Sequence, residues 1–188
     1  MSSVLVLLIL ALPAGVAMAQ PPTDPMRHAF LQRVDDYVGL HRRLEGPLPR
    51  EVITDDPDEL LKPRRALAAA IRVARADARQ GDIFSPAMAQ YFRLVIAEAL
   101  REGGIDDMRA IAMAEIHDTG TMVVARVNAD YPAGGPLSSM PNCLLAALPP
   151  LPRELQYRFV GSDLILWDVH AGLIVDFVPR ALPETTVP

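Results

Sequence analysis

The stretch that decides the fold is LQYRFVGSDLILWDVHAGLIVDFV, residues 155–178. It is mostly apolar, and two short breaks, Gly161-Ser162 and Ala171-Gly172, divide it into three segments. Two-residue connections of this kind are typical of hairpins between antiparallel strands. The sequence therefore predicts a three-stranded antiparallel meander.

Two faces of this meander follow from the hairpin turns, because residues paired across antiparallel strands lie on the same side of the sheet. The first face holds Tyr157, Phe159, Leu164, Leu166, Asp168, His170, Leu173, Val175 and Phe177. The second face holds Gln156, Arg158, Val160, Asp163, Ile165, Trp167, Val169, Ile174, Asp176 and Val178. We expect helices to cover the first face, which is the more apolar. On the second face, Arg158 and Asp176 flank the central strand and are expected to lie close enough to pair.

The amino-terminal half of the chain has the apolar spacing of amphipathic helices, with repeats every three or four residues. One helix is predicted from Met26 to about Leu44, before Gly46-Pro47. Another is predicted to begin at Pro86 and to end at Gly103-Gly104. Ser85 is a good N-cap for it, and proline suits the first helical position.

A further helix is predicted between these two, with Asp56 as its N-cap, an end near Arg79 and Gly81 as its stop. Pro63 lies near its start, so the regular part is expected to begin only there. At about 100° per residue, five arginines of this segment fall within a sector of roughly 100°. This arginine ribbon consists of Arg64, Arg65, Arg72, Arg75 and Arg79.

The arginine ribbon is a candidate site for an anionic ligand or an acidic protein partner, because guanidinium groups offer planar, paired donors to phosphates and carboxylates. The alternative, and the more common case for a run of charges, is a solvated face. Nearby acids such as Asp55, Asp58 and Glu59 would balance it. Exposed ion pairs contribute only about 0–1 kcal/mol each, so these acids neither require nor exclude binding.

Strand-like patterning begins at residue 109 and continues to 128, with a hairpin turn expected at Asp118-Thr119-Gly120. The proline-rich segment 131–152 is expected to be mostly loop, with one or two helical turns at 142–148. The chain is therefore predicted as α+β: three helices followed by an antiparallel sheet of about five strands, a hairpin plus the meander.

The first nineteen residues have the layout of a cleavable secretory signal peptide. The apolar run from Val4 to Ala19 is broken by Pro13 and Gly15, and it is shorter than the roughly 20 residues of a membrane span. We therefore expect a periplasmic or secreted protein with no further membrane span; an uncleaved anchor is the alternative. The expected division is a signal peptide at 1–19, a leader at 20–25, one domain at 26–180 and a flexible tail at 181–188.

Composition excludes some classes of protein. The net charge of −5 argues against nonspecific nucleic-acid binding. The single cysteine, Cys143, cannot form an intrachain disulfide, and it is expected to be a small buried residue. The chain contains no phosphate-binding glycine loop, nucleophile elbow, C-x-x-C or H-E-x-x-H motif, so no cofactor and no metal are predicted.

Two pairs of side chains are candidates for acid–base or metal chemistry if the protein is a hydrolase. Each pair shares a face of a predicted strand: Glu115/His117 and Asp168/His170. Tetrahedral zinc needs three or four protein ligands, so polar strand ends with hydrogen bonds are the simpler explanation. His28 and His41, thirteen residues apart, are expected on opposite sides of one helix.

Three segments resemble a widespread group of exported bacterial proteins that have no assigned activity. They are ARQGDIFSP (78–86), RVNADYP (126–132) and the stretch from Leu148 to Pro179. The resemblance implies export and supplies no activity or site. Together with the missing motifs, it favours a non-catalytic binding or interaction module, with a hydrolase as the alternative. An interaction module would dock through Ile165, Trp167 and Val169, and an exposed apolar patch there would support it.

Overall fold

The computed structural model describes residues 24–48, 55–103, 124–131 and 140–183. Its helices are α1 (Asp24–Glu45), α2 (Pro57–Ala74), α3 (Pro86–Gly103) and α5 (Asn142–Ala147). Its strands are β1 (Leu155–Val160), β2 (Asp163–Asp168) and β3 (Leu173–Val178). The predicted signal peptide and the predicted hairpin with Glu115 and His117 lie outside the described residues.

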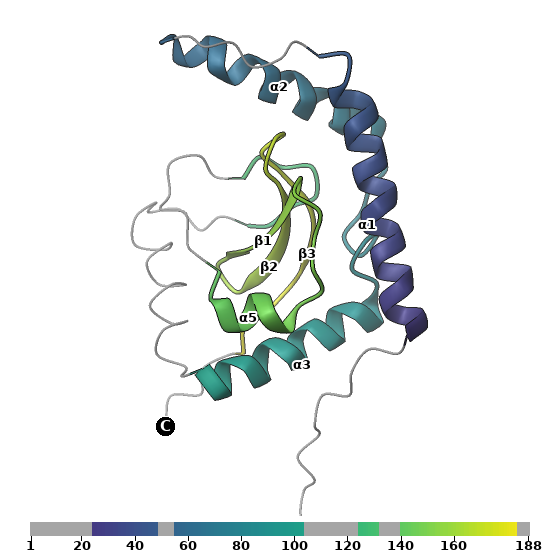
Figure 1. Cartoon of the computed structure of the whole chain (residues 1–188), viewed down its shortest axis with the longest axis vertical. Helices are drawn as coiled ribbons and strands as arrows, with labels where there is room; N and C mark the ends of the chain where they lie inside the picture. The colour runs from purple at the N-terminus through teal and green to yellow at the C-terminus, as the bar shows by residue number, and fades with distance from the viewer. Residues whose placement is uncertain (1–23, 49–54, 104–123, 132–139, 184–188) are drawn as a thin grey trace, which may run out of the picture.

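The α+β class is confirmed, with helices first and an antiparallel sheet of order β1-β2-β3 after them. The helices enclose this sheet: α1 runs along one side, α2 crosses above the β2–β3 turn, and α3 crosses the other end with α5 between it and the sheet (Figure 1). The count of five strands is not supported, since three strands are found in the described part. Segment 124–131 lies beside the start of β3, through the isolated bridge between Asp130 and Leu173 and backbone hydrogen bonds to Gly172 and Ile174.

Aromatic rings fill the core between the helices and the sheet. Phe84 lies between Phe30 of α1 and Phe92 of α3, with ring centroids 5.6 and 5.2 Å away. Phe92 in turn packs on Tyr157 of β1 at 5.7 Å. These contacts join two helices to the sheet, and the first face of the sheet is covered as predicted.

The helix caps agree with the sequence, but the length of α2 does not. Asp56 caps α2 by accepting the N–H of Asp58, and Ser85 accepts the N–H of Met88 at the start of α3. The predictions that α2 begins only at Pro63 and extends to about Arg79 are both wrong. Pro63 has no N–H, so one carbonyl group of the first turn lacks its helical hydrogen bond. That turn is exposed, and solvent can bind the carbonyl group instead.

The end of α2 is set by a tertiary contact of Arg75, which lies one residue past the helix. Its backbone leaves the helical conformation at φ −121° and ψ 35°. Its guanidinium group donates to the carbonyl oxygen of Val175 in β3, with Nη1 and Nη2 each at 3.2 Å. Gly81 has a positive φ of 96°, but it lies in the loop after α2 and does not stop the helix.

The register of β1 with β2 is the predicted one. The predicted two-residue turn between β2 and β3 is wrong, because Asp168 pairs with Leu173 and residues 169–172 form the connection, and β3 also contains a β-bulge. Leu166 pairs with Asp176, but the next residue, Trp167, pairs with Ile174. One extra residue in β3 reverses the faces of everything after it. Asp176 therefore points toward the helices, and the predicted proximity of Arg158 and Asp176 is wrong.

Asp176 instead holds the loop between α2 and α3. Its carboxylate accepts the backbone N–H groups of Gly81, Ile83 and Phe84 at 2.8–2.9 Å, and that of Phe177 at 2.8 Å. The bulge thus places the carboxylate of Asp176 beside N–H groups of the α2–α3 loop that need an acceptor.

The second face of the sheet is covered rather than open. Ile165 is 0 % exposed and Trp167 is 9 % exposed, while Val169 is partly buried. Tyr131, from segment 124–131, packs on the Trp167 ring with centroids 5.0 Å apart. Docking through this face stays a prediction, but the exposed apolar patch that would support it is not found.

Candidate metal centre

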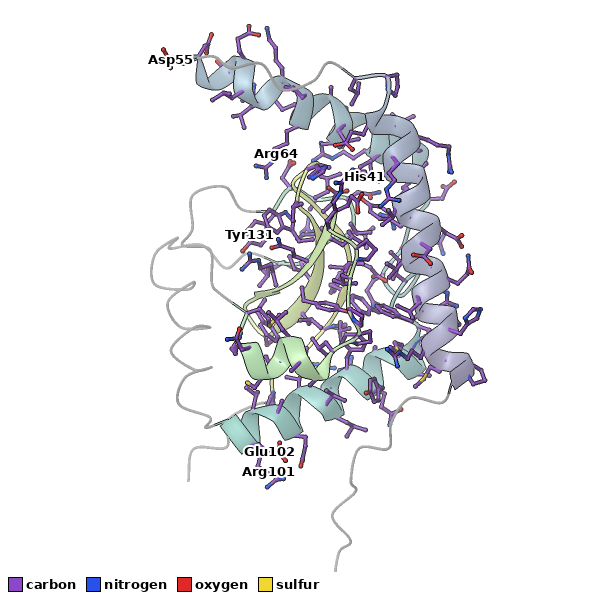
Figure 2. All side chains as sticks on the ribbon, in the orientation of Figure 1. His41, Asp55, Arg64, Arg101, Glu102 and Tyr131 are labelled. Carbon is purple, nitrogen blue, oxygen red and sulfur yellow. The ribbon has the colours of Figure 1, made fainter. Side chains whose placement is uncertain are left out.

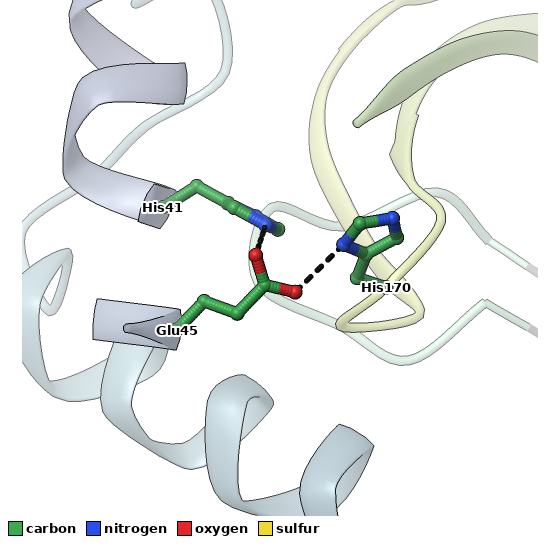
Figure 3. Close-up of side chains that lie close together, drawn as sticks. All are labelled: His41, Glu45 and His170. Carbon is green, nitrogen blue, oxygen red and sulfur yellow. Dashed lines mark hydrogen bonds and ion pairs between the residues drawn. The ribbon is translucent and has the colours of Figure 1, made fainter. Parts of the chain in front are cut away.

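Three metal-ligating side chains converge where the end of α1 meets the β2–β3 turn. His41 and Glu45 lie four residues apart on α1, so they share one helix face. His170 comes from the turn between β2 and β3 and points toward them (Figure 3). One ligand atom from each residue can be chosen so that all three lie within 4.8 Å of one another.

His41 is the buried member of this cluster, and in the neutral ring one of its nitrogens has no hydrogen bond. The side chain is 0 % exposed, and Nδ1 lies 2.6 Å from Oδ2 of Asp168. Because an ionised carboxylate only accepts, Nδ1 carries the proton and Nε2 of the neutral ring has a lone pair. In the neutral ring Nε2 has no hydrogen-bond partner, whereas in the protonated ring it forms an ion pair with Oε2 of Glu45, 3.3 Å away (Figure 3). Two lone pairs in this arrangement repel unless a cation lies between them.

Asp168 fixes this orientation of His41. Its Oδ2 also accepts the hydroxyl of Tyr37 at 2.6 Å. Its Oδ1 accepts the backbone N–H groups of His170 at 3.0 Å and Ala171 at 2.8 Å. Four hydrogen bonds thus occupy a carboxylate that is itself fully buried. A carboxylate that holds the far nitrogen of a histidine is a common second layer around protein-bound metals.

The electrostatics of the cluster favour a cation. Burial lowers the pKa of His41, but the hydrogen bonds and charges of Asp168 and Glu45 outweigh it and raise the pKa. Burial and the neighbouring Asp168 also raise the pKa of Tyr37, so this phenol stays a donor. The Nε2 side of His41 therefore attracts a proton or a metal ion.

The other two members of the cluster reach solvent. The side chains of His170 and Glu45 are 39 % and 42 % exposed, and Nδ1 of His170 lies 2.7 Å from Oε1 of Glu45. The cluster is therefore closed on the His41 side and open on the His170 side. An ion held here would keep a coordination position accessible from outside.

The predicted pairing of Asp168 with His170 takes a different form. The Asp168 carboxylate accepts the backbone N–H of His170, while the imidazole ring turns to Glu45. The two side chains therefore do not form an acid–base pair.

Cys143, predicted to be buried, is exposed in α5.

Two of the five arginines of the ribbon bind other parts of the protein. Arg72 donates to the carbonyl of Asn128 at 3.0 Å and pairs with Asp130 at 2.6 Å. Arg75 binds β3 and lies over the Tyr37 ring, 5.1 Å from its centroid. Burial lowers the pKa of Arg75, against the opposing charges of Tyr37 and two acids.

The remaining members of the ribbon lie apart from one another. Arg65 forms an exposed ion pair with Asp58, and Arg79 is an exposed residue beyond the end of α2. Arg64 packs against Gly172, two residues after His170. Anion binding by the ribbon stays a prediction.

His41 and Glu45 were not predicted as metal ligands. The signal that could have found them is the four-residue spacing H-x-x-x-E on a predicted helix, which places both side chains on one face. The spacing of histidines alone does not indicate this pair, because the second ligand on the helix is a carboxylate.

Comparison of the chain with protein-family models, curated proteins and solved structures finds no match. None of the helices in the described part of the chain is both long and apolar enough to cross a membrane.

Proposed function

We propose that this protein is an exported metal-binding protein, and that His41, Glu45 and His170 hold a divalent transition-metal ion. The observation that carries the proposal is the position of Nε2 of His41, a buried ring nitrogen that Asp168 orients toward the carboxylate of Glu45 and a second imidazole. Export is supported by the signal-peptide pattern of residues 1–19 and by the resemblance to exported proteins.

Zinc is the ion that this donor set fits best. Zinc binds histidine nitrogen and carboxylate oxygen at roughly 2.0–2.2 Å, so neighbouring ligands of a tetrahedral site lie about 3.3 Å apart. The separation of Nε2 of His41 from Oε2 of Glu45, 3.3 Å, has that value, whereas Nδ1 of His170 lies 2.7 Å from Oε1 of Glu45, a hydrogen-bond distance that would have to lengthen. Small rotations of the two exposed side chains would complete the geometry. Imidazole-rich sites also accept copper, nickel and iron, so zinc is the first probe and not the only one.

A metal-dependent hydrolase is the second candidate. Three protein ligands with a fourth position open to solvent are typical of catalytic zinc sites, whereas structural sites use four. The exposure of His170 and Glu45 favours such an open position.

Zinc titration of the purified, untagged protein tests the proposal. We expect one zinc ion per chain in competition with a chromophoric chelator, and about 100-fold weaker binding for His170→Ala, because one of three ligands is lost. His170 is exposed, so this variant is expected to fold.

The matched control is His28→Ala, which removes an exposed histidine from the same helix, α1. It is expected to bind zinc as the unaltered protein does. The proposal is overturned if the unaltered protein binds no stoichiometric zinc, or if both variants lose the same affinity.

A further inference from the structure

We propose that Arg64 is the anion-binding residue of the metal centre, so that the metal ion and the Arg64 guanidinium together hold an oxyanion, a phosphate or a carboxylate group. This inference rests on the proposed metal site and adds the class of ligand that its open position takes.

Arg64 reaches the turn that carries His170. Its side chain extends from α2 toward the sheet (Figure 2). The guanidinium group lies so close to Gly172 that a Cβ atom added there would overlap Nη2, Nε and Cζ of Arg64. Gly172 is two residues after His170, and its φ of 70° suits glycine. Because Gly172 has no side chain, the guanidinium group of Arg64 can lie against the turn that carries His170.

Arg64 has no ion pair and no hydrogen bond to any of the described residues, although it is partly buried. Its neighbours in the ribbon differ, since Arg65 and Arg72 pair with Asp58 and Asp130. A partly buried guanidinium group loses some hydration without gaining an acceptor, which leaves its donors available to a ligand.

The charge at the site also favours an anion. The carboxylates of Glu45 and Asp168 balance a divalent ion, which leaves the positive charge of Arg64 unbalanced. Arginine binds oxyanions through two parallel N–H donors, and a metal ion with an open position accepts an oxyanion oxygen. An oxyanion that uses different oxygens for the two partners would satisfy both.

Absorption spectroscopy of the cobalt-loaded protein tests this inference, because the d–d bands of Co²⁺ respond to a new ligand in the open position. We expect inorganic phosphate to change the spectrum in a saturable manner. In Arg64→Gln the phosphate affinity should fall by about 10- to 100-fold, as expected for losing a charge-assisted hydrogen bond. The affinity for Co²⁺ itself should not fall. A parallel titration with acetate distinguishes a carboxylate ligand from phosphate.

The control is Arg65→Gln, the neighbouring arginine with an exposed ion pair of its own, which should bind phosphate normally. The inference is overturned if cobalt binds but neither anion changes the spectrum, or if Arg64→Gln binds phosphate as the unaltered protein does. Failure of the protein to bind Co²⁺ or Zn²⁺ at all overturns the metal site itself, so the two failures are distinguishable.

Discussion

Replacing Asp168 with alanine is expected to destabilise the metal-free protein by about 3–5 kcal/mol and to weaken zinc binding of the folded protein by about 10–100-fold. The stability loss follows from four hydrogen bonds, since the variant leaves donors of Tyr37, His41 and Ala171 buried without an acceptor. The loss of affinity follows from His41, whose ring would no longer be held with Nε2 toward Glu45.

Asp168→Asn separates these two effects. An amide oxygen can still accept the N–H groups of His170 and Ala171, so the loss of stability should be smaller. The amide nitrogen would then face Nδ1 of His41, which must become an acceptor and move its proton to Nε2. Zinc would have to displace that proton, so its affinity should fall although the shape of the site is kept.

Urea unfolding in the presence of a chelator measures the stability without a contribution from bound metal. Imidazole ¹⁵N spectra report which nitrogen of His41 carries the proton, and we expect Nδ1 in the metal-free protein and Nε2 in Asp168→Asn. Asp77→Ala, at an exposed position, is the control and should change nothing measurable. Unaltered stability in Asp168→Ala would refute the role assigned to this carboxylate.

Local patterns were sufficient to predict the elements of this fold. The two-residue turn at Gly161-Ser162 specifies a hairpin and the pairing of Val160 with Asp163 next to it. A second hairpin was also predicted correctly, although its connection is longer than the predicted turn, since Asp168 pairs with Leu173. The caps Asp56 and Ser85 are likewise local, because each bonds an N–H two or three residues away. Such features were predicted correctly because the residues that determine them are neighbours in sequence.

Features that depend on distant residues were predicted wrongly. The bulge in β3 directs Asp176 to N–H groups of the α2–α3 loop, about ninety residues earlier in the chain. The end of α2 depends on Arg75 reaching Val175, a hundred residues later. A single sequence does not indicate these pairings.

The candidate site illustrates both cases. The spacing of His41 and Glu45 was available in the sequence, but their closeness to the β2–β3 turn depends on how α1 packs on the sheet. Asp168 was predicted only as a possible partner of His170, two residues away on the same strand. Its role became apparent once the structure placed a histidine from residue 41 and the hydroxyl of Tyr37 against it.

Replacing Asp176 with alanine is expected to cost about 3–5 kcal/mol of stability while leaving zinc affinity unchanged. The N–H groups of Ile83 and Phe84 would lose their acceptor in a fully buried environment, and that of Gly81 would lose it in a partly buried one. Each orphaned buried donor costs about 1–3 kcal/mol before the loop relaxes, and relaxation reduces the total.

Urea unfolding gives the free-energy change, and hydrogen exchange shows where it arises. The amides of Ile83 and Phe84 should lose more protection than those of β1, which Asp176 does not contact. The control is Asp163→Ala, on the same sheet. It removes one exposed hydrogen bond, the one that the backbone N–H of Arg180 donates to Asp163. It should cost about 1 kcal/mol or less. Equal losses of unfolding free energy in the two variants would contradict this prediction. The carboxylate of Asp176, with four donors, would then stabilise the protein no more than that of Asp163, with one.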